Sequence, residues 1–215
     1  MELSEQEQVR RQSLQTMRDM GINPYPADEY VVTGYSKDIK EGFKDDDTTA
    51  EWYTGKEVRI AGRLMSKRIM GKASFIELQD SKGRIQVYVS RDDIQAPVAE
   101  GETATTVEQQ MYNVVFKKLL DIGDFIGIEG FVFRTQMGEI SVHAKKLTVL
   151  AKSLRPLPIV KYKDGVAYDG FNDPEQRYRQ RYVDLIVNDG VKDVFLKRAT
   201  IIRTMRRVFD EAGYT

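Results

Sequence analysis

The sequence contains no cysteine, only one histidine (His143), and no apolar run long enough to cross a membrane. Without cysteine there can be no disulfide scaffold, thiolate metal site or cysteine nucleophile. A single histidine excludes a multi-histidine metal centre, so we expect no metal site. The N-terminus lacks the basic and apolar stretches of a signal peptide. These absences predict a cytoplasmic protein that does not associate with membranes.

Motifs for catalysis are missing as well. The sequence has no glycine-rich phosphate loop and no nucleophile with an identifiable base nearby. A hydrolase that uses paired carboxylates is the enzyme alternative, but the spacing of the acidic residues singles out no pair. We therefore expect no catalytic residue and no cofactor within these 215 residues.

The charges are balanced in number but uneven along the chain. Residues 1–55 contain 6 basic and 12 acidic side chains, residues 56–150 contain 14 and 12, and residues 151–215 contain 13 and 9. A dense basic stripe opens the middle segment, with only Glu57 to oppose it; its members are Lys56, Arg59, Arg63, Lys67, Arg68 and Lys72. Such a stripe suits a phosphate backbone, although a charged, solvated strand edge is an equal alternative.

The first 55 residues read as a helical extension. Ser4 and Glu7 have the spacing of a capping box, and Gly21 followed by Pro24 supplies a stop, so we predict a helix over residues 5–20. Its thin apolar face consists of Val9, Leu14, Met17 and Met20. Residues 28–50 are polar, and we expect a loop there with at most a short helix.

From Lys56 the apolar period changes to two, which is typical of half-buried strands. We predict strands at residues 56–64, 74–80, 84–89, 125–134 and 139–150. A two-residue turn at Ser81-Lys82 pairs Glu77 with Gln86 and Phe75 with Tyr88. Residues 96–108 form an acidic, threonine-rich insertion that reads as a surface loop, and residues 109–120 are predicted to be helical.

Five strands with a helix between the third and the fourth is the order of an OB-fold barrel. The expected fold class is therefore mainly β with flanking helices (α+β): a five-stranded OB barrel with an N-terminal helical extension and C-terminal helices. OB barrels bind oligonucleotides on the face of strands two and three.

The parity of the second strand places Phe75 on that binding face. A lone exposed phenylalanine is more often covered by another segment, but Arg68, Lys72 and Gln86 nearby favour a base-stacking role. Glu77, Arg84, Tyr88 and Arg63 are further outward candidates. On the fifth strand, Glu139 and His143 share one parity, although each is by itself more often a solvated surface residue.

After the barrel, Arg155-Pro156-Leu157-Pro158 predicts a linker. Asp173-Pro174 predicts the start of one helix, which ends at Asn188-Asp189-Gly190. A last helix over residues 194–213 has an apolar stripe with no partner in the sequence, and we expect residues 191–215 to be either disordered or packed against another molecule.

Several of these segments resemble bacterial lysyl-tRNA synthetases. In the barrel they are residues 62–65 (Gly-Arg-Leu-Met), 68–75 (Arg-Ile-Met-Gly-Lys-Ala-Ser-Phe), 78–80 (Leu-Gln-Asp) and 83–89 (Gly-Arg-Ile-Gln-Val-Tyr-Val). Outside it they are residues 21–26, 154–158 and 177–186. The chain looks like the N-terminal portion of that class II family, namely the anticodon-binding domain and the start of the catalytic domain. Aspartyl- and asparaginyl-tRNA synthetases share a looser form of these segments and remain an alternative.

The resemblance implies roles for four residues in binding the anticodon of tRNA-Lys. Phe75 stacks on an anticodon base, Arg68 and Gln86 recognise the central uridine, and Glu139 contacts the neighbouring wobble position. Arg63, Lys72, Glu77, Arg84, Tyr88 and His143 are possible further RNA contacts. A single-strand binder without sequence preference is the second interpretation, and a pure interaction module is the third.

The resemblance also implies an organisation and a parent enzyme. Residues 1–55 are the helical extension, 56–150 the anticodon-binding OB domain, 151–190 a hinge with a helix, and 191–215 the truncated start of the catalytic domain. The parent would be a cytoplasmic homodimer that ligates lysine to its tRNA with ATP and magnesium. Because the later catalytic motifs are absent from the sequence, these 215 residues are expected to be inactive alone.

Overall fold

The computed structural model describes residues 3–98, 103–158, 161–163, 166–168 and 170–214. Contacts within the chain divide it into two compact units, residues 1–156 and 157–215. No helix among the described residues is both long and apolar enough to cross a bilayer.

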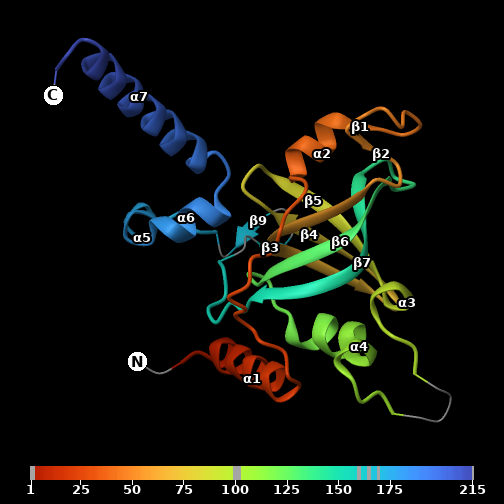
Figure 1. Ribbon diagram of the computed structural model, residues 1–215. Helices are drawn as coiled ribbons and strands as arrows, with labels where there is room; N and C mark the ends of the chain where they lie inside the picture. Colours follow the sequence, from red (N-terminus) through yellow and green to blue (C-terminus); the bar gives the residue numbers. More distant parts are fainter. Residues whose placement is uncertain (1–2, 99–102, 159–160, 164–165, 169, 215) are drawn as a thin grey trace. The chain divides into compact units, whose positions relative to one another are not determined.

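The first unit is built around a closed five-stranded barrel (Figure 1). Its strands are β3 (Glu57–Met70), β4 (Ala73–Gln79), β5 (Arg84–Ser90), β6 (Phe125–Arg134) and β7 (Ile140–Ala151). They are hydrogen-bonded in the order β3-β4-β5-β7-β6, and β3 closes the barrel by pairing with β6. All pairs are antiparallel except β5 with β7. The predicted OB fold and its five strands are confirmed.

Alternation of apolar residues fills the barrel interior. Ile76 and Leu78 of β4 are buried, as are Ile85, Val87 and Val89 of β5. The residues between them are half-buried on the outer face. The turn after β4 has the predicted two-residue geometry, since the Asp80 amide donates to the Gly83 carbonyl at 2.9 Å.

A β-bulge lies in the middle of β3. The pairing of β3 with β4 slips by one residue between Leu64 and Ser66, and Leu64 and Met65 are both buried. Because side chains alternate between faces, a bulge exchanges the inward and outward positions on its two sides. Residues 57–63 and residues 66–70 of this strand therefore follow opposite parities.

Helices cover one end of the barrel. After α3 (Arg91–Ile94) come α4 (Val107–Gln110) and the wider π-type helix η1 (Met111–Leu119), where one helix was predicted over residues 109–120. Tyr112 and Phe116 of η1 are fully buried and stack with ring centroids 5.3 Å apart. Within the predicted insertion loop, residues 99–102 lie outside the described residues.

The N-terminal extension is part of the same packed unit as the barrel. Helix α1 (Glu5–Asp19) begins at the predicted Ser4–Glu7 capping box and packs against η1. The short helix α2 (Ser36–Gly42) and the parallel strands β1 (Phe43–Lys44) and β2 (Trp52–Tyr53) follow. Met17, Ile39, Phe43 and Trp52 are buried in one hydrophobic cluster with the barrel residues. The extension thus completes the barrel core.

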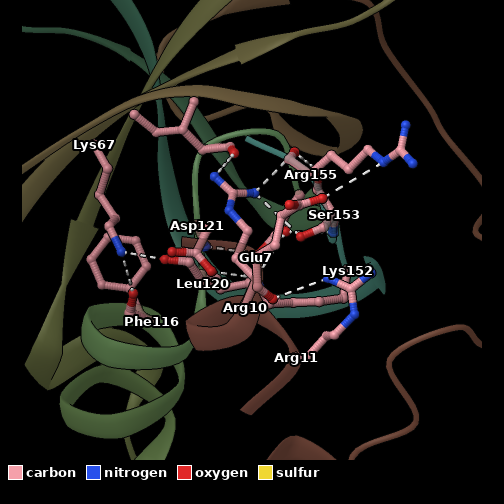
Figure 2. Close-up of polar contacts among 12 residues, drawn as sticks. Glu7, Arg10, Arg11, Lys67, Phe116, Leu120, Asp121, Lys152, Ser153 and Arg155 are labelled. Atoms are coloured by element: carbon pink, nitrogen blue, oxygen red, sulfur yellow. Dashed lines mark hydrogen bonds and ion pairs between the residues drawn. The ribbon is translucent and has the colours of Figure 1, made fainter. Parts of the chain in front are cut away.

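The buried face of α1 agrees with the predicted one only in part. Met17 is fully buried and Met20 packs against the core as predicted, but Val9 is exposed, and Arg10 and Ser13 are buried instead. The Arg10 guanidinium donates to the carbonyls of Ile122 (2.9 Å), Ser153 (3.2 Å) and Arg155 (3.5 Å), as Figure 2 shows. An arginine that satisfies three carbonyls can be buried where an unpaired charge could not.

A buried ion-pair cluster lies beside Arg10 (Figure 2). The Lys152 ammonium is 2.6 Å from an Asp121 oxygen and 2.9 Å from Asp124 Oδ2. Asp124 also accepts hydrogen bonds from the backbone amides of Asp121 (2.8 Å) and Ser153 (2.7 Å). Burial raises the pKa of Asp124, while Lys152 and these amides act in the opposite direction. The cluster joins the end of β7 to the turn before β6.

The described residues of the second unit form three helices and a hairpin. Strands β8 (Lys161–Lys163) and β9 (Val166–Tyr168) pair antiparallel. The helix predicted from Asp173 to Asn188 is interrupted at Gln180, giving α5 (Pro174–Arg179) and α6 (Arg181–Val187). The buried Asp184 accepts hydrogen bonds from Arg177 (2.8 Å), Asn188 (2.7 Å) and Arg181, which ties the two helices together. Helix α7 (Val191–Glu211) has no buried residue.

Replacing Lys152 by methionine should lower the free energy of unfolding by about 3–5 kcal/mol, because it leaves the buried Asp124 without its cation. Urea denaturation at pH 7 measures the change. Lys146→Met is the matched control, since the exposed Lys146 of β7 pairs with Glu129 of β6 at the surface and its loss should change the value by less than about 0.5 kcal/mol. Equal losses in the two variants would contradict a structural role for the cluster.

Candidate nucleic-acid interface

Strand register places one set of outward side chains side by side across the barrel. Arg68 lies opposite Phe75, Phe75 opposite Tyr88, and Tyr88 opposite His143. In the next row Glu77 lies opposite Gln86. Four strands therefore contribute to a single face.

The rings on this face form a continuous aromatic cluster. Phe75 and Tyr88 have centroids 5.3 Å apart, and Tyr88 meets His143 edge-on at 4.9 Å. His143 stacks on Phe131 at 4.8 Å, and Phe133 is 5.8 Å from His143. Packing against neighbours restrains each ring, so the cluster offers ring faces of fixed orientation on which another planar group can stack.

A groove of about 850 Å³ lies over this face. The exposed turn between β6 and β7 borders it, where the Met137 side chain is 94% exposed. Its lining residues are Lys40, Ser66, Arg68, Phe75, Ile76, Glu77, Gln86, Tyr88, Phe133, Thr135, Gln136, Met137, Glu139 and His143. A groove with an apolar floor and amide, carboxylate and guanidinium groups around it suits a base, which needs both stacking and hydrogen bonds.

Ion pairs neutralise the two carboxylates of the groove. Lys40 Nζ is 2.7 Å from Glu139 Oε1, and Arg84 Nη1 is 3.3 Å from Glu77 Oε2. Arg68 is exposed and forms no ion pair with any residue that the structure describes. The guanidinium of Arg68 is thus available to a polyanion or to a base edge.

His143 is held in place from the short helix α3. Its Nε2 is 2.8 Å from Asp93 Oδ2, and Lys145 Nζ contacts the other oxygen of Asp93 at 2.5 Å. Burial acts to raise the pKa of Asp93, but the hydrogen bonds from Lys145 and His143 outweigh it and lower the pKa. Asp93 therefore fixes the ring that stands between Tyr88 and Phe131.

The structure brings together seven of the ten predicted site residues. Arg68, Phe75, Glu77, Gln86, Tyr88, Glu139 and His143 all line the groove. The other three, Arg63, Lys72 and Arg84, do not line it. Arg63 donates to the Gly123 carbonyl at 2.9 Å, and its guanidinium lies 4.2 Å from the centroid of Phe125.

The basic side chains of residues 56–72 do not form one surface, so the interpretation of this stripe as a single phosphate-binding surface is wrong. Lys67 is largely buried and donates to the carbonyls of Phe116 (3.1 Å) and Leu120 (2.5 Å) at the end of η1. Burial lowers the pKa of Lys67, although Asp121 and Asp124 act to raise it. Arg59 lies over the Tyr30 ring and near Glu129. The β3 bulge lies between Arg59 and Arg68, and Lys67, on the same side of the bulge as Arg68, points the other way.

Sequence reasoning missed several residues of the site. Phe131 and Phe133 alternate on β6 with the buried Val132, so their parity could have found them. Met137 lies in the predicted turn, where an exposed apolar residue is a usable signal. Lys40 and Asp93 belong to short helices outside the five strands, and no periodicity connects them to the groove.

Comparison with known proteins agrees with this geometry. Residues 58–150 match the tRNA anticodon-binding family, which is described as an OB-fold nucleic acid binding domain. The whole chain is homologous to lysine–tRNA ligases. It is 58% identical over 214 residues to the enzyme named so from Porphyromonas gingivalis strain W83, covering 100% of this chain and 35% of that protein.

Two further relatives carry the same name. The lysine–tRNA ligase of Azobacteroides pseudotrichonymphae is 58% identical over 212 residues, covering 99% of this chain and 39% of that protein. That of Christiangramia forsetii is 55% identical over 214 residues, covering 99% and 34%. The chain thus spans about a third of the length of these curated relatives.

Asp93→Asn should lower the free energy of unfolding at pH 7 by about 1 kcal/mol, because it removes a partly buried, charge-assisted contact. The folded pKa of Asp93 lies below its unfolded value, so this contribution is complete above about pH 4 and is lost as the pH falls through the folded pKa. Urea denaturation from pH 7 downward measures the difference. Asp92→Asn is the control, since Asp92 pairs only with its neighbour Arg91 at the surface. A difference that grows on acidification would contradict this assignment.

Proposed function

We propose that this chain binds the anticodon stem-loop of tRNA-Lys in the groove over β4, β5 and β7. The main observation that supports this proposal is that one barrel face combines a packed aromatic cluster with the unpaired Arg68 and the amide of Gln86. Proteins read single-stranded RNA loops by stacking the splayed bases on rings and bonding to their polar edges. The family match over residues 58–150 and the names of the relatives support the same assignment.

Each groove residue then has a distinct task. Phe75 stacks on an anticodon base, and Tyr88 behind it prevents the ring from swinging away. Arg68 and Gln86 bond to the edge of the central uridine. Glu139 accepts a hydrogen bond from the wobble base, and His143 extends the stacking surface. Glu77, Arg84, Lys72 and Arg63 are secondary: they shape the local charge without supplying base contacts.

The parent protein is proposed to be a cytoplasmic lysine–tRNA ligase that uses ATP and magnesium. The described residues include no group of three or more His, Cys, Asp or Glu side chains that could hold a metal ion. We therefore assign ATP and magnesium to the two thirds of the relatives that this chain does not span. The task of the present residues is to select the tRNA.

The second unit is proposed to lead into the catalytic part of that enzyme. Residues 151–190 would act as a hinge and residues 191–215 as the start of the catalytic domain. Helix α7 exposes a row of large apolar side chains, namely Val194, Ile201, Ile202, Met205, Val208 and Phe209. Such a row requires cover, and a homodimer partner supplies it in this proposal.

The selectivity of binding tests the proposal. The dissociation constant of this chain for a tRNA-Lys anticodon stem-loop should rise about tenfold or more when the central uridine is replaced, because Gln86 and Arg68 lose their partners. Gln86→Ala should discriminate less between the two loops than the unaltered chain does, because only Arg68 then bonds to the uridine. Equal binding of both loops by the unaltered chain would leave a single-strand binder without sequence preference.

Substitutions at Phe75 separate stacking from packing. Phe75→Leu keeps an apolar side chain but loses the aromatic face, and should weaken binding of the stem-loop by about 1–3 kcal/mol. Phe75→Trp should bind about as well as the unaltered chain. Binding is measured by fluorescence anisotropy and stability by urea denaturation. A Phe75→Leu variant that binds normally would remove Phe75 from the interface.

A further inference from the structure

Helix α2 contributes a wall to the groove from outside the barrel. Among the described lining residues, Lys40 is the one that comes from neither a barrel strand nor a turn between barrel strands. It also lies outside the segment that matches the OB family, residues 58–150. Neither the strand pattern nor the family match therefore gives it a role.

The position of α2 is fixed by the turn between β4 and β5 (Figure 1). Asp80 accepts the Ser36 amide at 2.6 Å and the Ser36 hydroxyl at 2.8 Å, while its Oδ1 also accepts the amides of Lys82 (2.7 Å) and Gly83 (2.9 Å). One carboxylate thus joins the first turn of the helix to the hairpin that carries Glu77 and Gln86.

Aromatic packing holds the rest of the helix. Gly34 and Gly42 flank α2, and a Cβ atom at either would lie within 3.0 Å of the Trp52 ring. Ile39, in the middle of the helix, is fully buried. These contacts hold α2 in an orientation in which Lys40 lines the groove.

Lys40 contacts only half of the Glu139 carboxylate. Its ammonium is 2.7 Å from Oε1, and no hydrogen bond to Oε2 is formed by the described residues. The Glu139 backbone is itself anchored, since its amide donates to the Thr135 hydroxyl at 3.0 Å. The carboxylate is therefore oriented with one oxygen occupied and the other free to accept a base N–H.

The positive charge of Lys40 also offsets the repulsion between the Glu139 carboxylate and RNA phosphates. RNA is a polyanion, and an ionised carboxylate in its binding groove repels phosphates. Arg84, on the strand next to Glu77, neutralises that carboxylate, but the barrel offers Glu139 no comparable cation within the described ion pairs. Lys40 supplies it from α2.

We propose that Lys40 is a positioning residue for anticodon recognition: it orients and neutralises Glu139 so that this carboxylate can read one base. The inference rests on the proposed function above, and it adds the N-terminal extension to the reading machinery. It also assigns Asp80 as the residue that holds α2, and hence Lys40, in place.

The experiment compares Lys40→Met with Lys37→Met, because Lys37 lies on the same helix, is exposed, and among the described residues pairs with Glu41 alone, one turn away. Stem-loops that vary at the wobble base and, separately, at the central uridine serve as probes. Lys40→Met should weaken binding about tenfold and abolish the preference at the wobble base, while the preference at the central uridine remains. Lys37→Met should stay within about twofold, and Lys40→Arg should retain the preference.

A second background separates positioning from direct phosphate contact. If Lys40 acts through Glu139, Lys40→Met should have little further effect in a Glu139→Gln chain. Equal weakening in both backgrounds, with a salt dependence reduced by about one phosphate contact, would overturn the inference in favour of a direct contact. Unchanged wobble preference in Lys40→Met would overturn it as well. Failure of the unaltered chain to discriminate at the central uridine would instead overturn the proposed function, and this inference with it.

Discussion

Closure of the barrel through β3 is the constraint on which the rest of the molecule depends. This one strand pairs with β6 over residues 57–63 and with β4 over residues 63–70. A strand that serves two neighbours in succession has to bend, and the bulge at Met65 is where it does so. The other two barrel strands, β5 and β7, join the sheet through β4 and β6.

The bulge also selects which basic residue reaches the groove. Before it, the side chains of Arg59 and Arg63 turn toward Tyr30 and Phe125. After it, Lys67 enters the protein and satisfies carbonyls at the end of η1, and Arg68 emerges beside Phe75. An even row of charge in the sequence thus takes on three separate roles: surface packing, helix termination and, in the proposed function, contact with RNA.

Much of the fold could be predicted because it follows from local rules. Alternation located all five strands, the two-residue turn fixed the register of Phe75 against Tyr88, and Ser4 with Glu7 located the start of α1. The bulge could not be predicted, because one extra residue in a strand leaves no compositional mark. The burial of Arg10 was equally hidden, since the three carbonyls that make it possible come from residues more than 100 positions away.

The site divides in the same way. Residues on the strands, such as Gln86 and His143, were found by parity because a sheet repeats every two residues. Lys40 and Asp93 lie on short helices whose orientation is set by tertiary contacts with Asp80, His143 and Lys145. A side chain that reaches a site from a separately docked element has no periodic signal in its own segment. The sequence therefore identified residues on the strands that line the groove, but not the residues on separate helices that hold them in place.

The packing of Trp52 between two glycines has an evolutionary consequence. A Cβ at Gly34 or Gly42 would collide with that ring. A large residue at position 52 therefore requires glycine at positions 34 and 42. A substitution at any of the three positions would tilt α2 and displace the Lys40 ammonium in the groove. These positions should therefore change together or not at all among related sequences, as though they were binding residues, although none of them lines the groove.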